Sequence, residues 1–218
     1  GTPRLLLNSK SKAFPEGLAN RNGMVGKNLM FHPLTGVAGI FDEPMLGHEG
    51  PMACSILSQE FYETDPNRGF VRGYGLHSGR STTPMTYALG GYGIDNPIPW
   101  GAEHREIMDN IYPYLAGLTI VSEDLPEQHN CVTLDPDLTD SDGIPAPKIT
   151  YRLGGNTRKM LRHGEEQAKE ILLAAGAKKV LSKNDDKVWW RAGWHQMGTC
   201  RMGDDPETSV VNGWGRSH

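Results

Sequence analysis

The sequence is poor in cysteine, has no long apolar run and carries no excess of basic residues. Its three cysteines, Cys54, Cys131 and Cys200, form no C-x-x-C pair, which argues against a disulfide framework or a zinc cluster and favours free thiols. No apolar stretch approaches the roughly 20 residues that a membrane-spanning helix needs. The 22 Lys and Arg residues against 26 Asp and Glu leave a net charge of −4, which excludes a strongly basic nucleic-acid-binding protein. We therefore expect no membrane segment and no nucleic-acid partner.

Two common types of ligand site are also missing. Gly26-Lys27 is followed by Asn28, and position 21 is Arg, so the P-loop pattern fails twice. No G-x-G-x-x-G follows a predicted strand, and the glycines at 90–93 are typical of a plain loop. The eight histidines form no H-E-x-x-H and no pair with zinc-ligand spacing. The sequence therefore predicts no phosphate loop and no metal site.

Glycine and proline, by contrast, are abundant. The chain has 27 Gly and 15 Pro in 218 residues, well above their usual combined share of about 12%. Aromatic residues occur along the whole chain and the charges are balanced, which is typical of a folded protein rather than a disordered one. At roughly 150 residues per domain, the length predicts one large loop-rich domain or a domain and a half.

Hydrophobic periodicity predicts several strands interrupted by a few helices. The helix near 157–175 is the clearest, because Asn156 or Thr157 can cap its start and Gly176 is placed to end it. A turn is expected at Asp135-Pro136. No strict βαβ alternation is visible, so the pattern favours an α+β fold with an antiparallel sheet. The other predicted helices are 2–9 and 102–112, and the predicted strands are 34–41, 52–62, 70–76, 118–123, 131–134, 148–151 and 179–182.

Candidate chemistry is concentrated in residues 188–203. Trp189, Trp190 and Trp194 surround His195 in the sequence, and glycines at 193, 198 and 203 allow close backbone approach. Imidazole titrates near neutrality and aromatic neighbours exclude water, so His195 is suited to be a general base. A packed core histidine is the alternative interpretation, because one histidine without a visible partner identifies no reaction.

The same segment resembles a known family. Residues 194–203, Trp-His-Gln-Met-Gly-Thr-Cys-Arg-Met-Gly, resemble the active-site segment of the glucose–methanol–choline (GMC) oxidoreductases, and the resemblance continues through 205–216. Residues 2–9 resemble the second half of the family's second signature, although Lys10 stands where the family usually has Gly. Residues 26–33 and the segments 130–134 and 144–151 are similar to the family in the same order. The resemblance therefore covers the whole chain.

This resemblance implies a two-domain protein, in which a Rossmann-like FAD-binding domain joins a substrate domain of antiparallel sheet and helices. Residues 1–33 would be the tail of the FAD-binding domain and a connecting segment, 34–187 the substrate-binding domain, and 188–218 the active-site segment that returns to the FAD-binding domain. The family's dinucleotide motif would precede residue 1 and its second catalytic residue would follow residue 218. We therefore expect a fragment that binds FAD poorly and is inactive alone.

The resemblance also implies an activity, which is oxidation of the CH–OH group of an alcohol, sugar or polyol with transfer of a hydride to flavin N5. His195 would be the general base, Trp194 would lie beside the substrate or simply pack, and Thr2 and Pro3 would contact FAD. The family's chemistry admits an electron-acceptor protein as a further partner. The choice between dehydrogenase and oxidase stays open, as does the compartment, cytoplasm or periplasm in a bacterial type. The alternative function is a non-catalytic sugar- or polyol-binding module that has lost its flavin domain.

Overall fold

The chain divides into two compact units, each assembled from separated segments. The computed structural model describes residues 1–49, 54–79, 83–90, 98–181 and 192–218. Unit 1 consists of residues 1–32, 124–154 and 193–218. Unit 2 consists of residues 33–123 and 155–192. These compact units group residues 124–154 with the two terminal segments, whereas the domain boundaries expected from the family resemblance stay a prediction.

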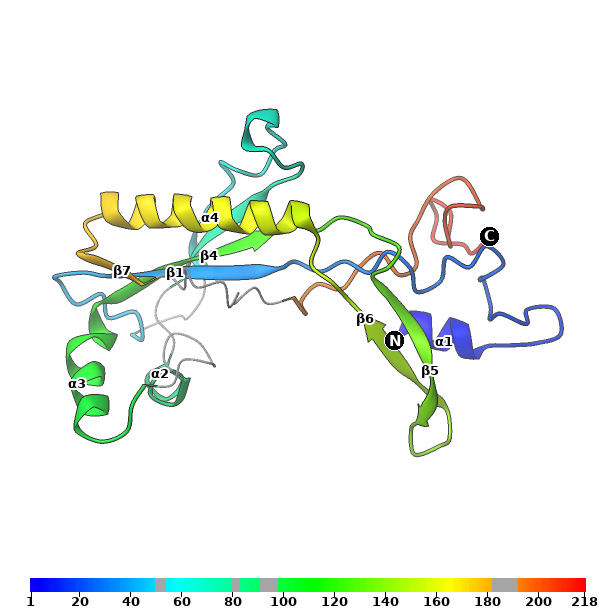
Figure 1. Cartoon of the computed structure of the whole chain (residues 1–218), viewed down its shortest axis with the longest axis horizontal. Coiled ribbons are helices and arrows are strands. Elements are labelled where there is room, and N and C mark those ends of the chain that lie inside the picture. Colours follow the sequence, from blue (N-terminus) through cyan, green and yellow to red (C-terminus); the bar gives the residue numbers. More distant parts are fainter. Residues whose placement is uncertain (50–53, 80–82, 91–97, 182–191) are drawn as a thin grey trace. The chain divides into compact units, whose positions relative to one another are not determined.

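Unit 2 is built on a five-stranded sheet in the order β2-β3-β4-β1-β7, in which every paired strand is antiparallel. This sheet, seen near edge-on in Figure 1, confirms the predicted α+β class with an antiparallel sheet. Strand β4 lies at its centre and is fully apolar or small on both sides, as a covered strand requires. The strands are β1 (Leu34–Ile40), β2 (Cys54–Ser58), β3 (Tyr74–Gly79), β4 (Leu115–Ser122) and β7 (Lys179–Leu181).

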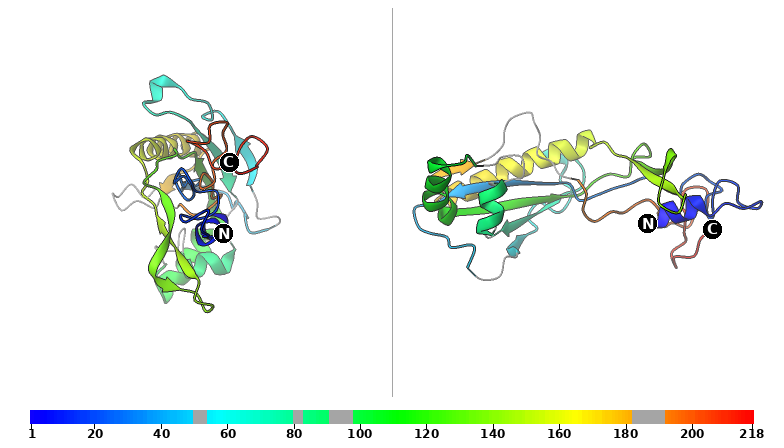
Figure 2. Two further views of the ribbon diagram at one scale, coloured as in Figure 1. Left: turned by 90° about the vertical axis from the view of Figure 1, so that its right-hand side faces the viewer. Right: turned by 90° about the horizontal axis from the view of Figure 1, so that it is seen from below.

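Helix α4 (Gly155–Ala174) lies along one face of this sheet, as Figures 1 and 2 show. Its buried residues include Met160, Leu161 and Leu172, which follow helical spacing. The predicted end at Gly176 is confirmed. Gly176 has a φ of +101°, its N–H donates to the carbonyl of Leu173, and the next N–H donates to the carbonyl of Leu172. This pair of hydrogen bonds is the Schellman arrangement that glycine favours.

The opposite face of the sheet packs on smaller helices. Consecutive strand residues point to opposite faces. Gly39 of β1 approaches Leu172 of α4, whereas the preceding Ala38 is buried with Tyr87 and Tyr112. Tyr87 belongs to α2 (Pro84–Gly90), which the sequence did not predict, and α3 (Ala102–Asn110) follows it. A 3₁₀ turn (Tyr112–Tyr114) then leads into β4.

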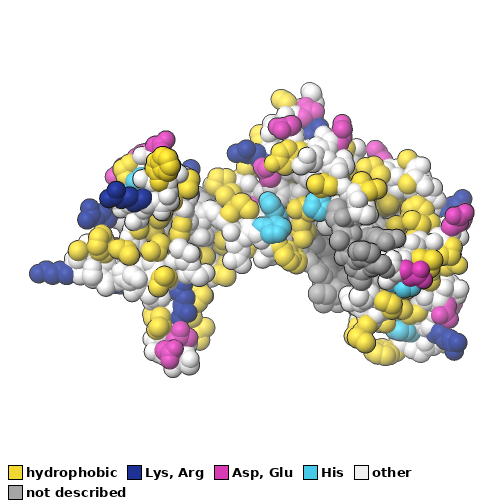
Figure 3. All heavy atoms as spheres, turned by 180° about the vertical axis from the view of Figure 1, so that it is seen from behind, with side chains coloured by type: hydrophobic (Ala, Val, Ile, Leu, Met, Phe, Trp, Pro, Cys, Tyr) yellow, Lys and Arg dark blue, Asp and Glu magenta, His cyan; other side chains and the backbone are white. Residues whose placement is uncertain are grey.

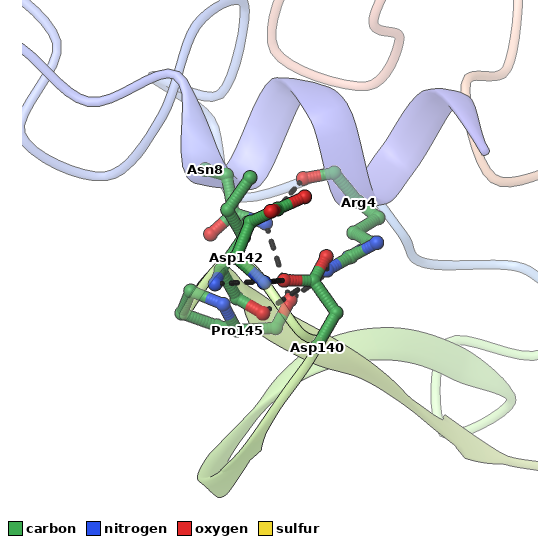
Figure 4. Close-up of polar contacts among 6 residues, drawn as sticks. Arg4, Asn8, Asp140, Asp142 and Pro145 are labelled. Carbon is green, nitrogen blue, oxygen red and sulfur yellow. Dashed lines mark hydrogen bonds and ion pairs between the residues drawn. The ribbon is translucent and has the colours of Figure 1, made fainter.

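Unit 1 contains helix α1 (Thr2–Asn8) and a hairpin of β5 (Cys131–Thr139) and β6 (Pro145–Thr150). Arg4 joins them in Figure 4: its Nη2 lies 2.6 Å from Oδ2 of Asp140, and its Nε donates to the carbonyl of Pro145 at 2.8 Å. Asn8 donates to the carbonyl of Arg4 at 3.0 Å, within the helix. The remainder of the unit is mostly loop, as its glycine and proline content predicts.

Several expectations about element boundaries are wrong, and the clearest cases have a tertiary reason. The strand predicted at 70–76 begins at Tyr74, because Arg72 has a φ of +68° and a side chain at Gly73 would overlap the carbonyl oxygens of Phe61 and Tyr62. This close approach imposes a bend where the sequence pattern indicates extended chain.

The expected turn at Asp135-Pro136 is a strand irregularity rather than the chain reversal. Asp135 Oδ1 accepts from the backbone N–H groups of Asp137 and Leu138, so the side chain does form a local turn, but β5 continues to Thr139. The reversal lies after Asp140, whose Oδ1 accepts from the N–H of Ile144 at 3.0 Å. Asp135 and Asp140 are both suited to accept backbone N–H groups at a chain reversal, so the sequence alone does not indicate which of them forms it.

The expected cap of α4 is also wrong, because the helix begins at Gly155. The carboxamide of Asn156 instead accepts from the N–H of Val71 and donates to its carbonyl, both at 2.9 Å.

The helix predicted at 102–112 ends at Asn110, before the 3₁₀ turn that contains Pro113. The predicted strands 52–62 and 179–182 extend partly into residues outside the described ranges. Within those ranges the first of them is too long, because β2 ends at Ser58 and the N–H of Tyr62 donates to the carbonyl of Gln59 in a turn.

Charged side chains of both signs are scattered over the face shown in Figure 3, in agreement with the small net charge. None of the helices in the described ranges combines the length and the apolarity that a membrane crossing needs.

Candidate functional site

The His195 segment runs antiparallel to the chain just before β1. Met30 and Met197 form a β-bridge, with backbone N–H···O distances of 3.0 and 3.1 Å. The N–H of His32 donates to the carbonyl of Trp194 at 3.1 Å. All four residues belong to unit 1, and Figure 1 shows the two segments in blue and orange. Three backbone hydrogen bonds therefore hold residues 194–197 against residues 30–32.

This pairing brings two histidines into direct contact. The Nδ1 atoms of His32 and His195 lie 2.8 Å apart, which is hydrogen-bond distance. The two rings meet edge to face, with centroids 4.9 Å apart and planes at 81°. His195 has a φ of +56°, a left-handed conformation that few residues other than Gly adopt. The contact between the two Nδ1 atoms therefore constrains the direction of the His195 ring.

His195 is exposed and His32 is half-buried. The imidazole of His195 is therefore not packed in a core, and it can meet a ligand. Among the described residues, the side-chain hydrogen bond of His195 is the one that joins its Nδ1 to Nδ1 of His32, and Nε2 makes none. Nδ1 of this ring is thus engaged by His32, whereas Nε2 has no hydrogen-bond partner within the described residues.

Close packing of backbones beneath the site explains one of the glycines. Gly198 has a φ of +89°, and a side chain at this position would overlap the carbonyl oxygen of Asn28. Asn28 itself is 1% exposed. Gly203 is only moderately crowded, because a Cβ at this position would lie 3.0 Å from Cβ of Ser209, and Gly193 has open space. Gly198 is therefore the position at which the segment needs glycine.

Two apolar side chains close to His195 in the sequence are exposed. Trp194 is 45% exposed and Met197 is 39% exposed. Exposed aromatic and thioether groups next to an imidazole suit a flat, partly apolar ligand ring, so these residues fit a flavin or a substrate carbon chain. Trp189 and Trp190, which the sequence also placed near His195, lie outside the described residues.

The predicted cofactor residues Thr2 and Pro3 lie at the start of α1. Pro3 is buried, whereas Thr2 is exposed. In the part of the chain that the structure describes, neither is hydrogen-bonded to His32 or His195. Thr2 is therefore the one of the two whose side chain can meet a ligand.

Cys200 follows the site but does not suit nucleophilic chemistry. Burial raises the pKa of its thiol. Its apolar neighbours include Met24, Val25 and Val210. A thiol in such surroundings stays protonated and packs as a small apolar side chain.

His32 is the site residue that sequence reasoning missed. In the sequence it stands only within the segment 26–33 that resembles the family, and 163 positions separate it from His195. No spacing rule joins residues so far apart, because the contact depends on the backbone pairing of Met30 with Met197.

Comparison with known proteins gives a consistent result. Residues 126–218 match the family model described as GMC oxidoreductase. The chain is 42% identical over 216 residues, 98% of its length, to the 2-methyl-1,2-propanediol dehydrogenase of Mycolicibacterium austroafricanum. It is 28% identical to the paromamine 6'-oxidase of Streptomyces fradiae over 98% of its length, and 28% identical to the fructose dehydrogenase large subunit of Gluconobacter japonicus over 100%. The chain spans 38%, 36% and 38% of these three relatives.

Proposed function

Because this chain belongs to the GMC oxidoreductase family, we propose that it serves the FAD-dependent oxidation of a CH–OH group to a carbonyl group. The observation that carries the proposal is the exposed imidazole of His195, held by the backbone and by His32 beside the exposed ring of Trp194. The names of the relatives, two dehydrogenases and an oxidase, support the same class of reaction.

His195 acts as the general base in this proposal. A neutral imidazole nitrogen with a free lone pair can take the hydroxyl proton of an alcohol, and Nε2 is the nitrogen of His195 that His32 does not engage. The O–H bond of the substrate breaks, an N–H bond forms at Nε2, and the electron pair of the O–H bond stays on the oxygen. The resulting alkoxide character makes the carbinol carbon a better hydride donor.

FAD, when bound, supplies the two-electron acceptor for that hydride. Trp194 and Met197 fit a flat ring because they are exposed and apolar, and Thr2 fits a polar part of the cofactor. Pro3 would act through the start of α1, in which it is buried.

We propose small alcohols, sugars or polyols as the substrate class. The 42% identical relative is named for 2-methyl-1,2-propanediol, and the more distant ones are named for paromamine and fructose. Trp194 offers an apolar wall on which the CH face of such a molecule can pack. An electron-acceptor protein would complete the cycle in a dehydrogenase, and the reduced cofactor would be reoxidised by oxygen in an oxidase.

Substitution of His195 in the flavin-loaded holoenzyme tests the proposal. Stopped-flow absorbance would follow flavin reduction by 2-methyl-1,2-propanediol and by fructose. The variant His195→Ala should lose about 10²- to 10⁴-fold in rate, the usual contribution of a general base. His129→Ala is the matched control, since His129 is an exposed histidine of the same unit that pairs with Glu127 instead. An unchanged rate in His195→Ala, at equal flavin content, would refute the assignment, and absence of flavin reduction in the wild type would favour the binding-module alternative.

A further inference from the structure

The contact between the Nδ1 atoms of His32 and His195 requires a proton between the two nitrogens. Packing of the two aromatic rings alone would not require one. Two nitrogen atoms 2.8 Å apart must share one proton, because two bare lone pairs repel and two N–H groups clash. Neutral imidazole carries a proton on only one of its nitrogens. The state of His32 therefore determines which nitrogen of His195 is bare.

Only two neutral arrangements satisfy this requirement. In the first, Nδ1–H of His195 donates to Nδ1 of His32, and Nε2 of His195 keeps its lone pair. In the second, Nδ1–H of His32 donates to His195, whose own proton must then lie on Nε2. Only the first arrangement leaves Nε2 of His195 able to accept a proton.

Resting on the function proposed above, we propose that His32 is the positioning residue of the base: its Nδ1 accepts the hydrogen bond from Nδ1–H of His195 and thereby keeps Nε2 of His195 unprotonated and directed to the substrate. His32 touches His195 and not the reacting atoms, so its role is exerted through the neighbouring ring. The backbone hydrogen bond from His32 to Trp194 and the left-handed conformation of His195 fix the register of the two rings.

The same contact stabilises the state that follows proton transfer. When Nε2 takes the hydroxyl proton, His195 becomes an imidazolium, and its Nδ1–H then donates to His32 as a charge-assisted hydrogen bond. Such bonds are about twice as strong as neutral ones. His32 thus favours the proton-loaded base over the free one, which is the direction that assists the reaction.

Three variants at position 32 separate this role from packing. His32→Leu keeps apolar bulk and removes the acceptor, so flavin reduction should fall about 10- to 100-fold, the usual loss when a group that orients a functional histidine is removed. The loss should be seen in the rate at saturating substrate rather than in KM. His32→Asn places an amide oxygen near the former Nδ1 and should restore most of the rate. His32→Asp supplies a charged acceptor and should move the acid limb of the pH profile to higher pH by about one unit or more.

A spectroscopic measurement tests the proton position without reference to turnover. In the holoenzyme labelled with ¹⁵N-histidine, Nδ1 of His195 should be protonated and Nε2 bare at neutral pH. His32→Leu should abolish this preference and remove one histidine signal, and His129→Leu should leave the His195 signals unchanged. Nε2 protonated in the neutral wild type would overturn the proposal.

The outcomes for His32 and His195 are distinguishable. If His195→Ala is inactive but His32→Leu keeps the wild-type rate and pH profile, the general-base assignment stands and the positioning role fails. If His195→Ala is fully active, the general-base assignment itself fails. Should His32→Leu not fold, the isosteric pair His32→Asn and His32→Asp still decides the matter, since identical acid limbs in these two variants would contradict an acceptor role.

Discussion

The carbonyl oxygen of Asn28 occupies the place where a side chain on Gly198 would begin. Gly198 has a φ of +89°, and Asn28 is almost completely buried. The contact joins the segment before β1 to the segment that carries His195, three residues from the imidazole. The position of the proposed base thus depends on the absence of a side chain at residue 198.

Gly198→Ala should therefore destabilise the protein by more than its backbone conformation alone requires. A left-handed conformation costs about 1–2 kcal/mol for a residue with a Cβ, and relief of the overlap with a buried backbone adds about 1–3 kcal/mol. The free energy of unfolding, measured by urea denaturation, should fall by the sum of these two costs. Gly23→Ala is the matched control, because Gly23 has a φ of +69° but open space around it. Equal losses in the two variants would mean that the contact with Asn28 is unimportant.

A second prediction concerns the packing of α4 on the sheet. A Cβ on Gly164 would lie 2.7 Å from Cγ2 of Ile120, in the central strand β4. Gly→Ala inside a helix normally stabilises by up to about 1 kcal/mol, but here overpacking should reverse the sign and cost about 1–3 kcal/mol.

The double variant with Ile120→Ala tests the cause of that loss. Ile120→Ala alone should cost about 2–5 kcal/mol as a cavity, and adding Gly164→Ala should then cost little or restore part of the stability, because the new methyl group enters the space that Ile120 leaves. Additive losses measured by thermal or urea unfolding would show that the two side chains do not compete for this space.

Local signals in the sequence predicted the features that depend on a few neighbouring residues. Helix α4 and its end at Gly176 follow from apolar spacing and a single left-handed glycine, and both are observed. Features that depend on distant backbone were not predictable. Gly73 bends the chain because it meets Phe61 and Tyr62, and His32 meets His195 because two segments of unit 1 pair at the Met30–Met197 bridge. The motif around His195 identified this residue from the sequence, whereas its contact with His32 is created by the tertiary fold.

A third prediction concerns the attachment of α1 to the hairpin. The side chain of Arg4 donates to Asp140, to the carbonyl of Pro145 and to the carbonyl of Ile144. Lysine cannot reproduce this fork of donors. Arg4→Lys should therefore increase amide hydrogen exchange at the tip of the hairpin, including the N–H of Ile144, which donates to Asp140.

The charge on Asp140 gives this contact a defined pH range. The hydrogen bond from Arg4, together with the N–H groups of Ile144 and Asp142, lowers the pKa of Asp140 below its ordinary value of 3.8. The stabilisation is thus present above pH 3.8 and is lost as the pH falls through the lowered value. The protection factor of the Ile144 amide, which is the intrinsic exchange rate divided by the observed rate, should fall in the same acid range in the wild type and less in Arg4→Lys. Arg105→Lys, on an exposed helix pair with Asp109, is the control and should leave this exchange unchanged.

The last prediction concerns His163, which packs with aromatic side chains between β3 and α4. Its Nδ1 lies 2.8 Å from the hydroxyl of Tyr74, and its ring meets the rings of Phe61 and Phe70 edge to face. Burial lowers the pKa of His163 from its ordinary value of 6.5, and the nearby charge of Arg68 adds to this effect against an opposing contribution from Glu170. This histidine is therefore neutral in the folded protein under conditions in which the unfolded chain already binds a proton.

Stability should accordingly fall as the pH decreases from 6.5 toward the lowered pKa of His163, and no such loss should occur above 6.5. His163→Gln keeps a polar partner for Tyr74 and removes the titration, so its urea midpoint should fall less than that of the wild type between about pH 7.5 and pH 5.5. His129→Gln, which removes an exposed histidine, should keep the wild-type pH dependence. The same slope in His163→Gln and in the wild type would assign the acid sensitivity to other groups, whereas a flatter slope would show that this half-buried ring limits stability in mild acid.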